Sequence, residues 1–337
     1  VTRREVTGIT PIVVGHDSRG RLATVTQGPR TRSTTYFNTS DSRNGYVQWV
    51  TNALGQTTSF SPDATGRILQ QLDPDGALTS FAWDGNSNLT SVTPPGQPAH
   101  GQSFTPVDLL SAYTPPSVPG VPVPSTLFAY NLDKQLTQTT RPDGLLVGRT
   151  YDSAGKLDLL TTPAGNVDYD YFGLTPCPGC APGRLQRITD PSGVVLDHAY
   201  DGLLLKSLTW SGAVSGTVSF GHDASFRVTS ETVTVGANTS SVAFGLDNDD
   251  LLICASPSTC SPAGTDALKI TLNAGNGLVT GSTHGLVTDT LTYNAFGELA
   301  SYAGKVGVTG VFSEVVATTA VPRDALGRIV QRVETNG

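Results

Sequence analysis

Short runs in which every second residue is apolar recur along the chain, and turn residues separate them. Val214, Val218 and Phe220 follow this spacing, and residues 232–235 (TVTV) repeat it. A period of two places successive side chains on opposite faces of a β-strand. Patterns of long amphipathic helices are missing from the sequence. The polarity pattern therefore predicts an all-β protein built from short strands.

These runs and turns are organised as a repeat of about 21 residues. Two adjacent blocks start at Tyr130 and Tyr151, and each has a glycine at its fifteenth position, Gly144 and Gly165. Each block holds two turn signals, which leaves room for two strands of about six residues. The repeat therefore predicts a series of antiparallel β-hairpins that must be continuous, because a single hairpin cannot bury its apolar face.

Within the second block, each marked residue has a structural role. The side chain of Asp152 can accept a hydrogen bond from the backbone two residues on, and Gly155 supplies a positive φ. We expect Tyr151 and Leu157 to pack in rows between neighbouring hairpins. Other copies of the unit carry equivalent residues at Gly193, Tyr200 and Gly327. We expect all of these positions to shape the repeat and none to be catalytic.

The phrase Tyr-Asp-x-x-Gly-Lys/Arg-Leu, followed by Thr-x-Pro-x-Gly, resembles the YD repeat of RHS proteins. Residues 151–165 are nearly a consensus copy, and recognisable units cover about two-thirds of the chain. The family includes bacterial polymorphic toxins, the BC components of insecticidal toxin complexes and the teneurin shell. The resemblance implies a sheet of hairpins that spirals into a hollow shell or tube. In the family, that shell holds a toxic polypeptide or presents a surface to another cell.

The repeat divides the chain into two arrays, residues 1–96 and 126–337. Between Pro94 and Pro124 there are nine prolines and a single formal charge, Asp108. Such a stretch favours polyproline II over ladder strands, so residues 97–125 are interpreted as a Pro-rich insertion or loop. We expect the second array to continue beyond residue 337 or into a neighbouring copy.

The unpaired edges of such a sheet lead to a prediction about partners. About 16 units give one turn of a spiral, with a bare strand at each edge. Natural proteins rarely leave such edges uncovered. We expect further repeats of the same polypeptide, or a second copy stacked head to tail, to occupy them.

Charge and composition narrow the remaining classes of function. The net charge of −7 argues against nucleic-acid binding, which needs a basic face. The longest uncharged run with apolar content contains five prolines, so no membrane-spanning helix is expected. Methionine is absent, so we expect that Val1 is not a translation start and that the chain is processed or excised from a longer one.

The four cysteines form two local pairs in loops that interrupt the repeat, Cys177 with Cys180 and Cys254 with Cys260. Two small disulfides are predicted, which would place the protein outside the cytosol, secreted or at a cell surface. Free thiols and a zinc site shared by all four sulfurs are the alternatives.

Candidate chemistry is sparse. The five histidines show no metal-ligand spacing, and no serine lies in a nucleophile-elbow context. The Asp190–Gly193 motif is interpreted as a repeat turn, although part of its sequence matches the autoproteolytic segment of the family. No cofactor or metal is expected.

The overall prediction is that the protein is a non-enzymatic part of an RHS/YD-repeat shell that encloses a polypeptide cargo. An extracellular filament-forming or adhesive protein is the alternative; a β-scaffold enzyme would need convergent carboxylates in a cleft.

Overall fold

The computed structural model describes residues 2–118, 120, 124–173, 181–260, 266–315 and 323–336, and in these residues the fold is all-β, without a helix. Twenty-nine strands are present. In chain order they are β1 (Thr2–Val6), β2 (Ile9–His16), β3 (Leu22–Gln27), β4 (Arg30–Tyr36), β5 (Val47–Thr51), β6 (Thr57–Pro62), β7 (Ile68–Leu72), β8 (Leu78–Trp83), β9 (Leu89–Thr93), β10 (His100–Phe104), β11 (Leu110–Thr114), β12 (Thr126–Tyr130), β13 (Leu136–Thr140), β14 (Leu146–Tyr151), β15 (Leu157–Thr162), β16 (Gly165–Tyr171), β17 (Leu185–Thr189), β18 (Val195–Asp201), β19 (Leu204–Ser211), β20 (Gly216–His222), β21 (Val228–Val235), β22 (Asn238–Leu246), β23 (Leu252–Ser256), β24 (Leu268–Leu272), β25 (Val279–His284), β26 (Val287–Tyr293), β27 (Leu299–Val306), β28 (Thr309–Val315) and β29 (Val333–Asn336).

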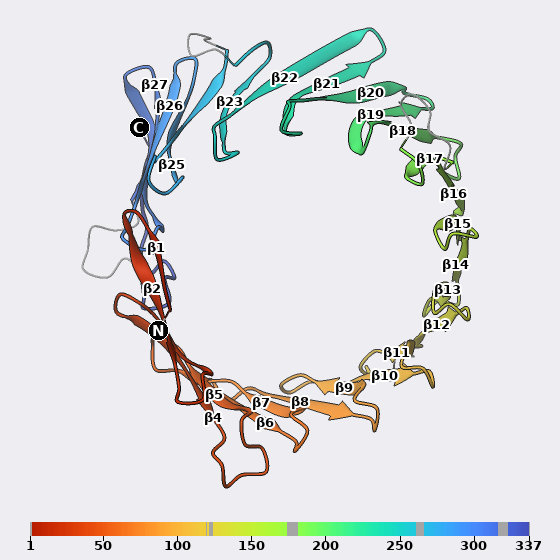
Figure 1. Ribbon diagram of the computed structural model, residues 1–337, viewed down its shortest axis with the longest axis vertical. Coiled ribbons are helices and arrows are strands. Elements are labelled where there is room, and N and C mark those ends of the chain that lie inside the picture. Colours follow the sequence, from red (N-terminus) through yellow and green to blue (C-terminus); the bar gives the residue numbers. More distant parts are fainter. Residues whose placement is uncertain are drawn as a thin grey trace.

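Each strand pairs antiparallel with the next one in sequence, so a single sheet runs as a meander from β1 to β29. The sheet curls into a ring, and β1 and β2 come round beside β25–β27 (Figure 1). Successive turns lie at opposite edges of a meander. We call the turns after even-numbered strands the even rim and the turns after odd-numbered strands the odd rim.

One five-residue turn recurs on both rims, and the turn at Asp152 shows why the sequence makes it. The Asp152 N–H donates to the carbonyl of Lys156 over 2.8 Å, and the Gly155 N–H donates to the carbonyl of Asp152 over 2.9 Å. Oδ1 of Asp152 accepts from the N–H groups of Ala154 and Lys156 at 2.9 and 2.8 Å. Gly155 has φ 78°, a conformation that costs glycine little. The same backbone bonds close the turns at 17–21, 52–56, 63–67, 73–77, 84–88, 105–109, 131–135, 141–145, 190–194, 223–227, 247–251, 294–298 and 324–328.

At seven even-rim turns, a Tyr or Trp near the end of the preceding strand ties its hairpin to the one before. The hydroxyl of Tyr151 donates to the carbonyl of Leu136 over 2.8 Å. Equivalent bonds to backbone carbonyls are made by Tyr36, Trp83, Tyr130, Tyr171, Tyr200 and Tyr293. The row of aromatic rings is therefore also a row of hydrogen bonds, which link consecutive hairpins in addition to the strand ladders.

The sheet is a single layer, and it has almost no conventional core. Nine of the described residues are buried, and most of them are small: Phe37, Pro62, Ala181, Tyr200, Cys254, Ser256, Ala267, Gly281 and Gly304. The accessible surface is 20180 Å² for a chain of 35.1 kDa, whereas a compact monomer of this mass exposes about 13,000 Å². Its stability must come from strand ladders, turns and half-buried side chains rather than from a second packed layer.

The structure corrects one expectation about the Pro-rich segment, residues 97–125. Strands β10 and β11 lie inside it and pair with each other, with β9 and with β12. The prediction of an irregular insertion or loop is therefore wrong for residues 100–114, which form a regular hairpin. The prolines lie on either side of this hairpin, and Pro106 lies in its turn, so no ladder hydrogen bond is lost.

No helix in the described part of the chain is long and apolar enough to cross a membrane.

Candidate functional site

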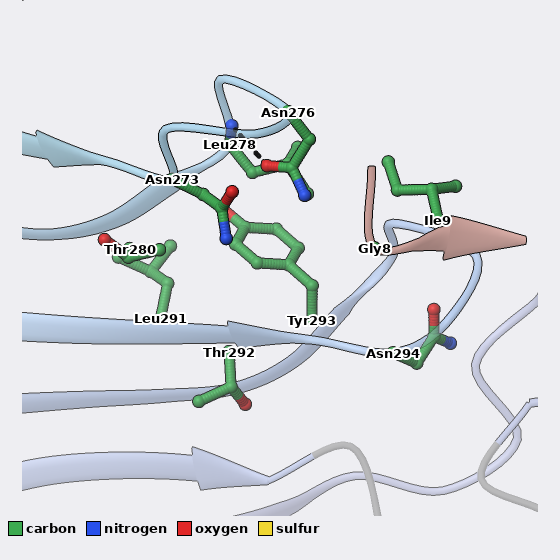
Figure 2. A pocket seen from close by; sticks show the side chains of 10 residues that line it. All are labelled: Gly8, Ile9, Asn273, Asn276, Leu278, Thr280, Leu291, Thr292, Tyr293 and Asn294. Atoms are coloured by element: carbon green, nitrogen blue, oxygen red, sulfur yellow. Dashed lines mark hydrogen bonds between the residues drawn. The ribbon is translucent and has the colours of Figure 1, made fainter. Parts of the chain in front are cut away.

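The two ends of the curled sheet meet at one place, which we call the junction. It joins odd-rim residues 7–10 and 27–30 to even-rim residues 273–278 and 294–298. Figure 2 shows Gly8 and Ile9 beside the Asn273–Leu278 turn, with Tyr293 below it. A cavity of about 310 Å³ lies between them. The junction brings together segments that are more than 260 residues apart in sequence.

Direct hydrogen bonds cross the junction. The Thr10 N–H donates to the carbonyl of Ala295 over 2.6 Å. The side-chain amide of Asn276 donates to the carbonyl of Thr7 over 3.2 Å. The backbone groups in these bonds, the Thr10 N–H and the carbonyls of Thr7 and Ala295, lie outside the strand ladders, so the contact joins rim to rim and is not a strand pairing. In the described residues β1 pairs only with β2, and β29 only with β28.

A charged cluster lies beside these bonds. The Arg30 guanidinium donates to both carboxylate oxygens of Glu298, over 2.7 and 3.1 Å. The amide of Asn294 donates to Oε2 of Glu298 over 2.8 Å, and Nε of Arg323 lies 3.4 Å from the same oxygen. The Arg30 guanidinium also covers the ring of Phe296, 3.8 Å from its centroid. One carboxylate therefore holds two cations and an amide in place.

Partial burial makes this cluster stronger than an ordinary surface pair. The side chains of Arg30 and Glu298 are 19% and 24% exposed. The hydrogen bond from Arg30 lowers the pKa of the Glu298 carboxyl below its ordinary value of 4.5, against the opposing effect of desolvation. The same bond raises the pKa of Arg30. The cluster is therefore fully charged across the neutral range, and it can hold the ends of the sheet together there.

Glu298 takes the fifth position of its turn, where other even-rim turns carry a donor that reaches the next turn. Lys156 donates to the carbonyl of Gly183 over 2.7 Å, and Gln135 donates to that of Gly155 over 2.8 Å. Arg67 and Arg227 make the same kind of bond, to Asp84 and Asp247. Glu298 is acidic, so it cannot donate such a hydrogen bond to the next even-rim turn. It accepts hydrogen bonds from Arg30 instead.

The repeat residues singled out in the sequence are distributed around the ring. Gly144, Gly155, Gly165, Gly193 and Gly327 have φ values of 81°, 78°, 125°, 83° and 84°. Gly327 alone lies at the junction, where a side chain would collide with the carboxylate of Glu298. Tyr130, Tyr151 and Tyr200 belong to the aromatic row, with Asp152 and Leu157 in the turn and strand that follow Tyr151.

Cys254 and Cys260 are joined by a disulfide, with their Cα atoms 5.8 Å apart, which ties the loop after β23 back to that strand. The other predicted pair, Cys177 and Cys180, lies outside the described residues and stays a prediction. In the described part of the chain, no group of three or more His, Cys, Asp or Glu side chains is placed to hold a metal ion.

Sequence reasoning missed the residues of the junction. Arg30, Asn276 and Phe296 follow no motif, and their partners are too distant in sequence for any periodicity to connect them. One signal was available, since Glu298 reverses the charge usual at its position in the repeat.

The comparisons with known proteins concern the fold of the chain. The model of the Teneurin YD-shell family matches residues 1–335. The chain resembles the crystal structure of TcdB2-TccC3 without its hypervariable C-terminal region, with a TM-score of 0.54 and 12% identity, over 91% of this chain and 20% of that one. A second similar structure is a Tc holotoxin pore from Photorhabdus luminescens, with a TM-score of 0.45 and 13% sequence identity. The match covers 91% of this chain and 19% of that one. The chain thus spans about a fifth of the length of these toxin-complex chains. No curated protein matches the sequence.

Proposed function

The chain belongs to the teneurin YD-shell family and has a structural role as shell, and from that premise we propose that its curled sheet encloses a polypeptide cargo. In this proposal the chain contributes no catalytic step. Its function is mechanical: the sheet separates a polypeptide from the surrounding solution.

The single-layer sheet is the observation that carries the proposal. The exposed surface exceeds that of a compact protein of the same mass by about 7,000 Å². Large apolar side chains within strands remain exposed, among them Trp49 at 37%, Leu127 at 47% and Val242 at 37%. Exposed apolar side chains that gather into large patches mark sites of contact with another molecule. A polypeptide held against one face of the ring would cover part of it.

A location outside the cytosol is part of the same proposal. The Cys254–Cys260 disulfide supports it, because reducing compartments rarely preserve structural disulfides. Secretion or display at a cell surface would suit a shell that protects or presents a polypeptide.

Protease protection tests enclosure directly. The natural polypeptide that contains this chain is expressed at its full length and exposed to proteinase K, and the surviving peptides are identified by mass spectrometry. We expect segments outside the repeats to survive within the shell. Glu298→Arg, which places three cations together at the junction, should open the ring and expose them. The matched control is Asp197→Arg, which reverses a charge on an exposed pair away from the junction. Equal digestion of the three proteins, with no protected segment, contradicts the proposal.

A further inference from the structure

Two apolar side chains project from neighbouring turns of the even rim. Leu203 and Phe226 are each 71% exposed. They line a cavity of about 520 Å³ together with Asp201, Gly202 and Leu204. Leu203 lies in the turn between β18 and β19, and Phe226 lies in the turn between β20 and β21. We call Leu203 and Phe226 the even-rim patch.

The backbone of Phe226 makes this exposure unusual. Phe226 has φ 67° and occupies the turn position at which Gly155 stands in its own unit. A bulky residue in this conformation is strained. An exposed aromatic ring also gains nothing from burial within the chain. In the isolated chain, Phe226 is therefore unfavourable both in its backbone conformation and in its exposure. Such a residue is typical of a contact site.

The junction shows what such an aromatic residue can contact. Phe296 also lies on an even-rim turn, and its ring packs against the odd rim at Gly28 and Arg30. This protein therefore already contains one contact in which an even-rim aromatic ring lies on an odd-rim turn. The even-rim patch has the same chemistry but lies away from the junction.

The odd rim carries a matching pair of exposed residues. Leu286 is 74% exposed in the turn between β25 and β26, and Val308 is 100% exposed in the turn between β27 and β28. We call these the odd-rim patch. In each patch the two residues lie on consecutive turns of one rim, two strand spacings or about 10 Å apart. The two patches thus agree in spacing and in apolar character.

We propose that the even-rim patch binds the odd-rim patch of a second copy of this chain, so that copies stack head to tail along the ring axis. The two surfaces differ, so the contact is heterologous and each bound copy leaves a free patch for the next one. The inference concerns assembly and does not depend on enclosure of a cargo.

The first test is the mass of the 337-residue chain in solution over a concentration series, by analytical ultracentrifugation. We expect the wild-type chain to form dimers and larger oligomers. Phe226→Gly should weaken association at least tenfold while the chain folds as well as before, because glycine suits the left-handed turn. Lys134→Gly is the matched control: it changes another exposed non-glycine residue with φ 63° on the even rim, and association should not change.

The second test distinguishes head-to-tail stacking from other self-association. The double variant Leu286→Ser/Val308→Ser removes the odd-rim patch and should also abolish oligomers. Mixed with Phe226→Gly, it should form one-to-one dimers and nothing larger, because that mixture has one intact patch on each protein. A wild-type chain that stays monomeric overturns the proposal, as does a Phe226→Gly chain that associates normally. A wild-type mass that saturates at the dimer, or a mixture that stays monomeric, overturns the head-to-tail arrangement.

Discussion

Replacing Glu298 by glutamine should open the junction without unfolding the sheet. The substitution keeps the shape of the side chain and removes the charge that holds Arg30 and Arg323. Hydrogen bonds to charged groups contribute about 1.5–3 kcal/mol each. The side chains of Arg30 and Glu298 are about a fifth exposed, so solvent still screens their attraction. The Coulomb energy of such a pair, about 4 kcal/mol at an effective dielectric constant of 20, is therefore an upper bound on what it contributes. We expect a loss of about 2 kcal/mol at the junction.

Amide hydrogen exchange at Thr10 measures this loss locally. The Thr10 N–H donates to Ala295 across the junction and is released when the junction opens. A loss of about 2 kcal/mol raises the open population, and with it the exchange rate, about 30-fold. Amides on the far side of the ring, such as that of Leu160 in β15, should exchange as before.

Asp197→Asn provides the control. Its partner Arg187 also makes two hydrogen bonds to one carboxylate, at 2.6 and 3.0 Å, but the side chains are 46% and 40% exposed. Exposed pairs contribute about 0–1 kcal/mol, so Thr10 exchange should not change. If Glu298→Gln leaves Thr10 exchange at the wild-type rate, the charged cluster does not hold the junction and the reasoning is wrong.

The junction should also depend on pH, with a sign that follows from the pKa of Glu298. Its carboxyl has a folded pKa below the ordinary 4.5, mainly because Arg30 donates to it. A lowered folded pKa contributes stability that is present above the unfolded pKa and is lost as the pH falls through the folded pKa. Thr10 exchange, corrected for its intrinsic pH dependence, should therefore accelerate below pH 4.5 in the wild type. A Glu298→Gln chain with the same acid response would contradict this assignment.

Three further predictions concern the repeat and the disulfide. Gly155→Val should lower the free energy of unfolding by at least about 1 kcal/mol, because valine is strained at φ 78°; unchanged thermal denaturation would refute the turn assignment. Tyr151→Phe should cost about 1 kcal/mol by the same measurement, because the carbonyl of Leu136 loses its donor; a stabilised variant would contradict the role of the hydroxyl. Peptide mapping without reductant should recover Cys254 linked to Cys260, and free thiols in native material would rule this out.

The features that sequence predicts well are those in which a residue acts on its own neighbourhood. Asp152 accepts from N–H groups two and four residues on, and Gly155 supplies its own φ, so both roles follow from local spacing. The 21-residue period and the family resemblance extend that local unit to the all-β, hairpin-repeat fold. The hairpin of β10 and β11 was missed because prolines were judged by their number, whereas their positions relative to the strands decide the outcome.

The junction could not be predicted in this way. Arg30 and Glu298 are 268 residues apart, and they meet only because the curvature of the whole sheet brings its ends round. That curvature is the sum of twist and bulges over many strands, and no single unit encodes it. The exposure of Phe226 could not be predicted either. The repeat unit around Phe226 is degenerate, and its sequence does not indicate which rim of the sheet stays uncovered.

A distance measurement between the two ends of the sheet tests the ring most directly. Spin labels, introduced as noncanonical amino acids at the exposed residues Arg4 and Ala274, would be measured by pulsed dipolar spectroscopy. The ring predicts a distance of about 20–30 Å, because these residues lie within three positions of Thr7 and Asn276, which are hydrogen-bonded to each other. An unrolled sheet would separate β1 from β24 by 23 strand spacings, about 110 Å. A single short distance, lengthened by Glu298→Arg, supports a shell closed at the junction; the absence of any short distance in the wild-type chain would contradict it.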